Sequence, residues 1–141
     1  MIKDSLEASG VISVTLESLD WAGYRNARTQ ETMQAYIMGW YPDYIDPDDY
    51  IYPFVQSTGG SWLHMNYNST KMDALVANAR GNTSETIREE IYGQINELIV
   101  DDCPLIPLYQ SGAYAVTKTN VAGVYLDISQ QWRNWLLYAA G

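Results

Sequence analysis

The stretch GWYPDYIDPDDY, residues 39–50, contains one tryptophan, three tyrosines, four aspartates and two prolines, and it has no basic residue. Its two prolines bracket a loop, because proline is poorly tolerated inside helices and central strands. The two adjacent aspartates near its end suit the first turn of a helix over residues 48–57. The stretch therefore predicts a junction, where a strand ends near Tyr41 and a helix follows a short loop.

Outward from this junction, strand-like and helix-like patterns alternate along the chain. Alternating apolar and polar residues, or short apolar runs, predict strands over residues 10–19, 34–41, 105–118 and 132–140. Helices are predicted over residues 21–33, 48–57, 70–80 and 82–102. This order of elements is typical of an α/β domain.

Two of the predicted helices carry apolar stripes at helical spacing. The stripes consist of Met72, Leu75, Val76 and Ala79, and of Ile87, Ile91, Ile95, Leu98 and Ile99. Such stripes predict core positions. Gly81 ends the first helix and Pro104 closes the second, while Asn82 and Glu85 resemble a capping box.

Composition limits the classes of partner. The chain has 141 residues, 47% of them hydrophobic, which suits one domain with a core. Its net charge of −9 disfavours nucleic acid and anionic membranes, and fits a cationic or amine-bearing ligand. Cys103 is the only cysteine, so no intrachain disulfide is expected, and we expect a buried small apolar residue there. The first residues lack a signal-peptide pattern, so an export signal would lie on a part of the chain not present here.

The four aspartates of residues 39–50 admit several interpretations. A calcium loop of the EF-hand type is disfavoured, because its glycine and its final glutamate are missing. Turn and cap roles are the simplest for Asp46, Asp48 and Asp49. Asp43 differs, because it follows the end of a strand, where ligands bind in open α/β sheets.

Two other classes of function stay open at this point. A hydrolase could use Asp43 and Asp46 as a carboxylate pair. A protein-interaction module could expose the tyrosines of the stretch. The lone His64 gives only weak support to a metal site or a catalytic triad, so no metal and no cofactor are expected.

The order of motifs along nearly the whole chain resembles the C-terminal part of the family 5 extracellular solute-binding proteins, the peptide-, dipeptide- and nickel-binding receptors of ABC importers. The motifs are Gly-x-Ile-x-Val-x-Leu at 10–16, Trp-x-x-Asp-Tyr-x-Asp-Pro at 40–47, Tyr-Asn at 67–68, Asp-x-Leu at 73–75, an arginine-bearing helix at 84–102, Pro-x-Ile-Pro-Leu-Tyr at 104–109 and Val-x-Gly-Val at 121–124. No single motif is decisive, but the ordered set is fairly specific.

The resemblance implies a two-lobed type II periplasmic-binding-protein fold that closes over its ligand. Residues 1–118 would be part of the second lobe, with a mixed sheet flanked by helices, and residues 119–141 would return toward the first lobe. The function implied is capture of an extracellular solute, most often a peptide, for uptake through ABC transporter permease subunits. The protein would then be extracellular, anchored at the cell surface or periplasmic, and not an enzyme.

The resemblance also implies a binding site. Asp43 would pair with the α-ammonium of a peptide, and the strand end formed by Gly39, Trp40 and Tyr41 would bind the ligand's main chain. Pro42 departs from what this mode requires, because it lacks an N–H group. Another oligomer, a sugar or a metal complex therefore stays open as the ligand.

The end of the chain is rich in large apolar residues. Residues 132–138 include two tryptophans, two leucines and a tyrosine. Without the first lobe, we expect these side chains to fold back on the same domain or to pair with a second copy. A free strand edge with apolar side chains favours weak self-association.

Overall fold

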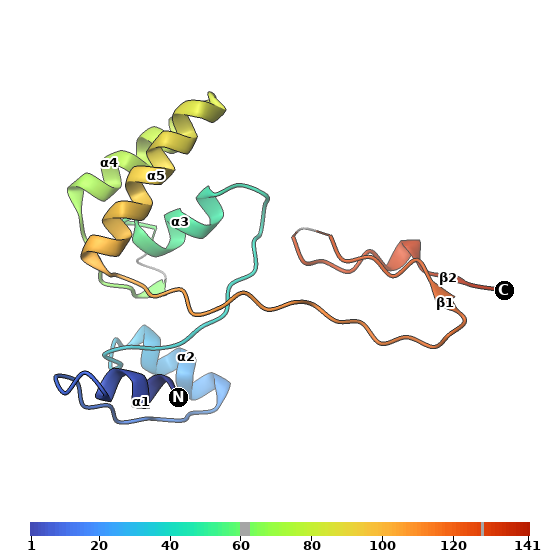
Figure 1. Ribbon diagram of the computed structural model, residues 1–141, viewed down its shortest axis with the longest axis horizontal. Helices are drawn as coiled ribbons and strands as arrows, with labels where there is room; N and C mark the ends of the chain where they lie inside the picture. The colour runs from blue at the N-terminus through green and yellow to red at the C-terminus, as the bar shows by residue number, and fades with distance from the viewer. Residues whose placement is uncertain (60–62, 128) are drawn as a thin grey trace. The chain divides into compact units, whose positions relative to one another are not determined.

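The computed structural model of the chain describes residues 1–59, 63–127 and 129–141 (Figure 1). The chain divides into two compact units, Met1–Tyr36 and Ile37–Gly141. Each unit has its own helices. No helix in these described ranges combines the length and the apolar character that crossing a membrane requires.

The first unit contains α1 (Ile2–Glu7) and α2 (Trp21–Thr29). α2 confirms the helix predicted over residues 21–33, although it ends earlier, at Thr29. Asp20 caps it by accepting a hydrogen bond of 2.7 Å from the Gly23 N–H. The segment between the helices is tied to α1 by side chains. Lys3 Nζ donates to the Val14 carbonyl over 2.6 Å, and the Val14 N–H donates to Glu7 Oε1 over 2.9 Å.

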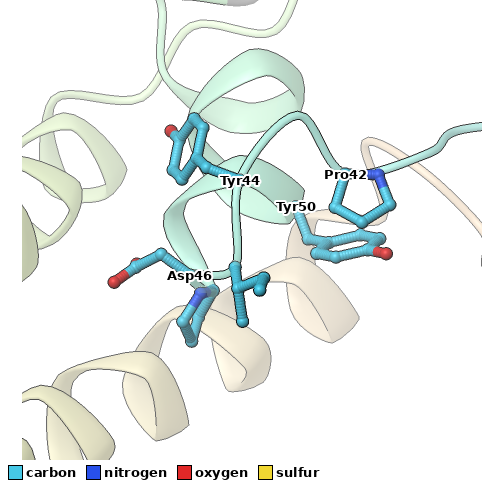
Figure 2. Close-up of a pocket in the computed structure, with 6 residues that line it drawn as sticks. Pro42, Tyr44, Asp46 and Tyr50 are labelled. Atoms are coloured by element: carbon cyan, nitrogen blue, oxygen red, sulfur yellow. The ribbon is translucent and has the colours of Figure 1, made fainter. Parts of the chain in front are cut away.

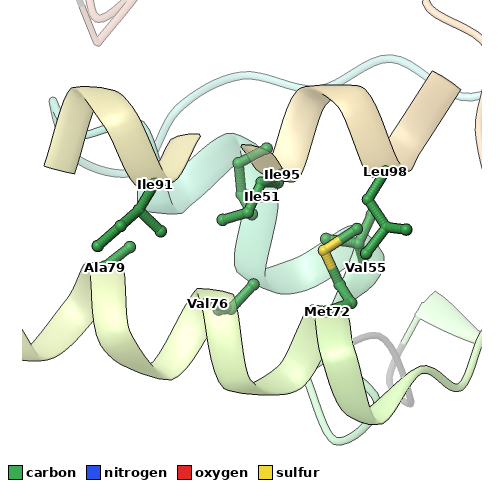
Figure 3. Packing of buried hydrophobic residues seen from close by; sticks show 8 residues of the cluster. All are labelled: Ile51, Val55, Met72, Val76, Ala79, Ile91, Ile95 and Leu98. Carbon is green, nitrogen blue, oxygen red and sulfur yellow. The ribbon is translucent and has the colours of Figure 1, made fainter. Parts of the chain in front are cut away.

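The second unit is built on three helices, α3 (Asp48–Val55), α4 (Thr70–Gly81) and α5 (Glu85–Asp102). α4 packs against α5, and α3 packs against α4 (Figure 1). The buried cluster between them consists of Ile51, Val55, Met72, Val76, Ala79, Ile91, Ile95 and Leu98 (Figure 3). The apolar stripes predicted the central members of this cluster, whereas Ile87 lies at the exposed start of α5.

The ends of α4 and α5 correct two predictions. Ser84, and not Asn82, is the N-cap residue of α5; Asn82 is the C-cap of α4, and its Oδ1 accepts from the Ser84 N–H over 2.9 Å. The short Asn82 side chain is thus already used within the link between the helices. Cys103 is exposed, not buried, because it follows the last turn of α5 in the left-handed conformation with φ of 50°.

Residues 121–127 and 129–139 include a hairpin-like pairing of two short strands. β1 (Val121–Ala122) and β2 (Tyr138–Ala139) pair antiparallel, with Val121 opposite Ala139, and the 3₁₀ turn η2 (Asn134–Leu136) precedes β2. Gly123 has φ of +77°, and a Cβ there would lie 1.9 Å from the Leu136 carbonyl oxygen. The glycine of the Val-x-Gly-Val motif is therefore required by this close approach.

The mixed sheet expected from the sequence does not form among the described residues. The strands predicted over 10–19, 34–41 and 105–118 are wrong for this structure, and that predicted over 132–140 is reduced to β2 and an isolated bridge between Leu126 and Trp132. A strand exists only through hydrogen bonds to a neighbouring strand. In the described ranges, no neighbouring strand pairs with these three extended segments.

The core of the second unit predicts the effect of one substitution. Ile95 is fully buried between the three helices, so Ile95→Ala should lower the free energy of unfolding by about 2–5 kcal/mol through lost burial and a residual cavity. Val100→Ala is the matched control, because Val100 lies on the same helix and is 79% exposed; it should change stability by less than about 0.5 kcal/mol. Urea titration would measure both, and equal effects would contradict the assigned core.

The C-terminal segment remains a candidate for self-association. Trp135 is 71% exposed and Tyr138 is exposed beside it. We expect Trp135→Ser to reduce any dimer seen by analytical ultracentrifugation at high concentration, because an interface buries large apolar side chains. Trp21→Ser, at a 69% exposed tryptophan of the first unit, should not. A chain that is monomeric with or without residues 132–141 would refute this prediction.

Candidate functional site

The loop from Trp40 to α3 takes its shape from carboxylate contacts. Three of its four aspartates are engaged by other residues of the second unit, each by different partners. The fourth, Asp43, differs from them in both exposure and contacts. The loop is therefore a specific structure and not merely a hydrated turn.

Asp46 fastens the loop to α5. Its Oδ1 accepts from the Arg88 guanidinium, and also from the Asp48 N–H over 2.9 Å at the start of α3. The hydrogen bond from Arg88 lowers the pKa of the Asp46 carboxyl. The contact with the Asp48 N–H confirms the turn and cap role predicted for Asp46.

Asp48 fastens the loop to α4. Its Oδ2 accepts from the Tyr44 hydroxyl over 2.7 Å and lies 3.3 Å from Arg80 Nε. The Arg80 guanidinium also lies over the Tyr52 ring, 4.0 Å from its centroid. Burial, followed by the hydrogen bond to Asp48, raises the pKa of the Tyr44 hydroxyl to about 12.

Asp49 connects α3 back to the residues before the loop. It is 2% exposed, and its Oδ2 accepts from Trp40 Nε1 and from the Asp43 N–H, each over 3.0 Å. The Trp40 ring meets Phe54 edge to face, with centroids 5.0 Å apart. Asp48 and Asp49 do occupy the first turn of α3 as predicted, but both are buried, which the sequence did not indicate.

The residues predicted from the sequence to bind a ligand occupy different environments. Trp40 is half-buried, while Gly39, Tyr41 and Asp43 are exposed. Trp40 and Asp43 are brought together, because both donate to the same oxygen of Asp49. Among the described residues, no hydrogen bond or ion pair engages the Asp43 carboxylate, so it is available to a partner from outside.

A shallow cavity of about 300 Å³ opens on the other part of the loop (Figure 2). It is lined by Pro42, Tyr44, Ile45, Asp46, Pro47 and Tyr50. None of the four predicted site residues lines it. Its walls are mainly apolar and aromatic. The Asp43 carboxylate is not part of this cavity.

Arg80 was not singled out from the sequence, and Arg88 entered only as the arginine of the helix motif at 84–102, although both hold the loop. The small number of basic residues could have pointed to them, because the chain has only 8 basic residues against 17 acidic ones. Buried or half-buried carboxylates need cationic or hydrogen-bonding partners. Both arginines lie on predicted helices that follow the acidic loop, so they were candidate partners for its carboxylates.

Comparison with known proteins assigns the chain to a family. The model of the bacterial extracellular solute-binding proteins, family 5 middle region, matches residues 1–62. The chain is 30% identical over 105 residues to heme-binding protein A of Haemophilus influenzae, covering 74% of this chain and 19% of that protein. It is 26% identical over 112 residues to the periplasmic oligopeptide-binding protein OppA of Salmonella typhimurium, covering 79% and 20%.

A third relative is matched over more of the chain. The dipeptide-binding protein DppE of Bacillus subtilis is 24% identical over 139 residues, which cover 94% of this chain and 25% of that protein. The chain thus spans 19–25% of the length of these curated relatives. The chain belongs to the family 5 bacterial extracellular solute-binding proteins.

Proposed function

We propose that this chain is part of the second lobe of a solute receptor that serves an ABC importer, outside the cell or in the periplasm. Its ligand would be a peptide or another small solute with a primary amine. Family membership and the names of two relatives, an oligopeptide- and a dipeptide-binding protein, support this proposal. The extended segments that lack neighbours here would pair with strands elsewhere in the receptor.

The observation that carries the proposal is the contrast between Asp43 and the other three aspartates of the loop. Asp46, Asp48 and Asp49 are occupied by internal partners, whereas the Asp43 carboxylate is exposed and unengaged among the described residues. A carboxylate held on a fixed backbone and left open can form a charge-assisted hydrogen bond with an ammonium group. The net charge of −9 would favour the approach of such a ligand.

The segment before the loop, which forms no strand among the described residues, would supply main-chain contacts. Pro42 has no N–H, and the Asp43 N–H already donates to Asp49, so any main-chain donors to a ligand would come from Tyr41 or earlier residues. An extended ligand laid along Gly39–Tyr41 would gain hydrogen bonds that do not depend on its side chains. Asp43 would then bind the amine at the end of that ligand.

The carboxylate hydrolase is less well supported than the receptor. A hydrolase that used Asp46 as a general acid would need a raised pKa at that carboxyl. The hydrogen bond from Arg88 instead lowers the pKa of Asp46. Within the part of the chain that the structure describes, no specific contact favours the interaction module over a receptor.

Calorimetry on the complete receptor would test the role of Asp43. Trialanine is a suitable probe, and N-acetyl-trialanine lacks the free amine. Asp43→Asn should weaken trialanine binding by about 1.5–3 kcal/mol, the range for hydrogen bonds to charged groups. Asp101→Asn, which removes one negative charge from an exposed position on α5, is the control and should leave binding unchanged.

Two results would remove Asp43 from the site. One is equal affinity for trialanine and N-acetyl-trialanine. The other is unchanged affinity in Asp43→Asn together with a clear loss in Trp40→Ala. Product formation from trialanine would instead indicate a hydrolase, and capture of a folded protein without competition by peptides would indicate an interaction module.

The two-lobe assignment makes a separate prediction for the isolated 141-residue chain. A ligand enclosed between two lobes loses one wall of its site when the other lobe is missing, and closed sites bury most of a small ligand's surface. Calorimetry of the isolated chain with trialanine should therefore show affinity weaker than micromolar. Micromolar or tighter binding would contradict a site shared between two lobes.

A further inference from the structure

The Asp49 carboxylate differs from those of Asp46 and Asp48 in the residues that it joins. A single oxygen, Oδ2, accepts from the indole of Trp40 and from the main chain of Asp43. These two residues lie on either side of Tyr41 and Pro42, at the point where the chain turns from the extended segment into the loop. One buried atom thus fixes both ends of that turn.

Asp49 can fix the turn because it is itself held in place. It lies in the first turn of α3, and α3 is anchored by Ile51 and Val55 in the core cluster. The second contact of the Trp40 ring, with Phe54, also comes from α3. The orientation of the indole is therefore set from two directions by the same helix.

The hydrogen bond to the main chain of Asp43 orients the backbone from which the Asp43 side chain extends. With its N–H directed inward at Asp49, the backbone at Asp43 has one orientation, and its side chain is exposed. Because Pro42 has a fixed φ, the turn between Trp40 and Asp43 has little other freedom. The backbone that carries this carboxylate therefore needs no ordering when a ligand binds.

We propose that Asp49 is the positioning residue of the amine site: it orients Trp40 and Asp43 toward the ligand and does not contact the ligand itself. This inference rests on the proposed function for the identity of the ligand. Asp46 and Asp48 have a different task, because they fasten the later part of the loop to α5 and α4. The affinity of the site thus depends on a carboxylate that is 2% exposed.

Hydrogen exchange at the Trp40 indole tests the first half of the inference without any ligand. In ¹H–¹⁵N spectra of the isotope-labelled chain, the Trp40 signal is the one that Trp40→Phe removes. In the unmodified chain, this indole should exchange about tenfold to a hundredfold more slowly than that of Trp135, which is 71% exposed. Comparable exchange rates at the two indoles would overturn the proposal, and this comparison requires no variant of Asp49.

Asp49→Asn is the informative variant, because it preserves size and removes the charge. It should speed exchange at the Trp40 indole by about tenfold, as a charge-assisted hydrogen bond becomes a neutral one. Asp73→Asn is the matched control. Asp73 also lies in the first turn of a helix, and it accepts a loop N–H, from Ser57 over 2.8 Å, but not from Trp40 or Asp43.

The second half is tested by binding of trialanine to the complete receptor. Asp49→Asn should weaken binding by about tenfold, whereas Asp73→Asn should not. Faster indole exchange together with weaker binding supports the proposal. Unchanged exchange, or unchanged affinity despite faster exchange, overturns it. If the unmodified receptor binds no free-amine peptide, the proposed function fails, and the exchange measurements still decide whether Asp49 holds Trp40.

Discussion

The packing of α3 against α4 is the constraint on which the loop depends. α3 has eight residues, and its first turn buries two aspartates, which is unfavourable unless their oxygens find donors. Ile51 and Val55 offset that cost by filling the space between α4 and α5. Each large apolar side chain buried in this way contributes about 1.5–3 kcal/mol. Without that anchoring, Asp49 would have no fixed position from which to hold Trp40.

The contacts made by Asp46, Asp48 and Asp49 also explain why so acidic a loop is stable. Four carboxylates within seven residues repel one another, and only local cations or donors can offset this. Arg80 and Arg88 supply the cations, and Tyr44, Trp40 and main-chain N–H groups supply the donors. The distribution of these partners leaves Asp43 alone exposed. Electrostatics within the loop thus separates the structural aspartates from the one proposed to meet the ligand.

The sequence predicted those parts of the fold that depend on local pattern. The apolar stripes of α4 and α5 identified Val76, Ile91 and Ile95 as core, because apolar residues at helical spacing mark the face that packs against neighbours. The sequence also distinguished Asp43 from the other three aspartates of the loop, because it follows the end of a strand-like segment. The strand patterns failed because alternation reports which residues could pair, while pairing needs a neighbour that the described residues do not offer.

Other features could not be predicted, because they depend on contacts between distant residues. Nothing near Asp49 in the sequence indicates that it would be buried against the Trp40 indole. The arginine partners of Asp48 and Asp46 lie on helices that come much later in the chain. Cys103 was expected to be buried from residue type alone, but the end of α5 places it beyond the core, where a left-handed residue closes the helix.

The ion pair between Asp46 and Arg88 joins residues that are 42 positions apart, and this separation has a consequence for the order of folding. The contacts between α4 and α5 are local, since the two helices are joined by a short link, so they can form early. The loop lacks its cation on α5 until that helix exists. During synthesis, the loop would thus emerge from the ribosome well before Arg88, and would reach its final shape only after α5 had emerged and packed.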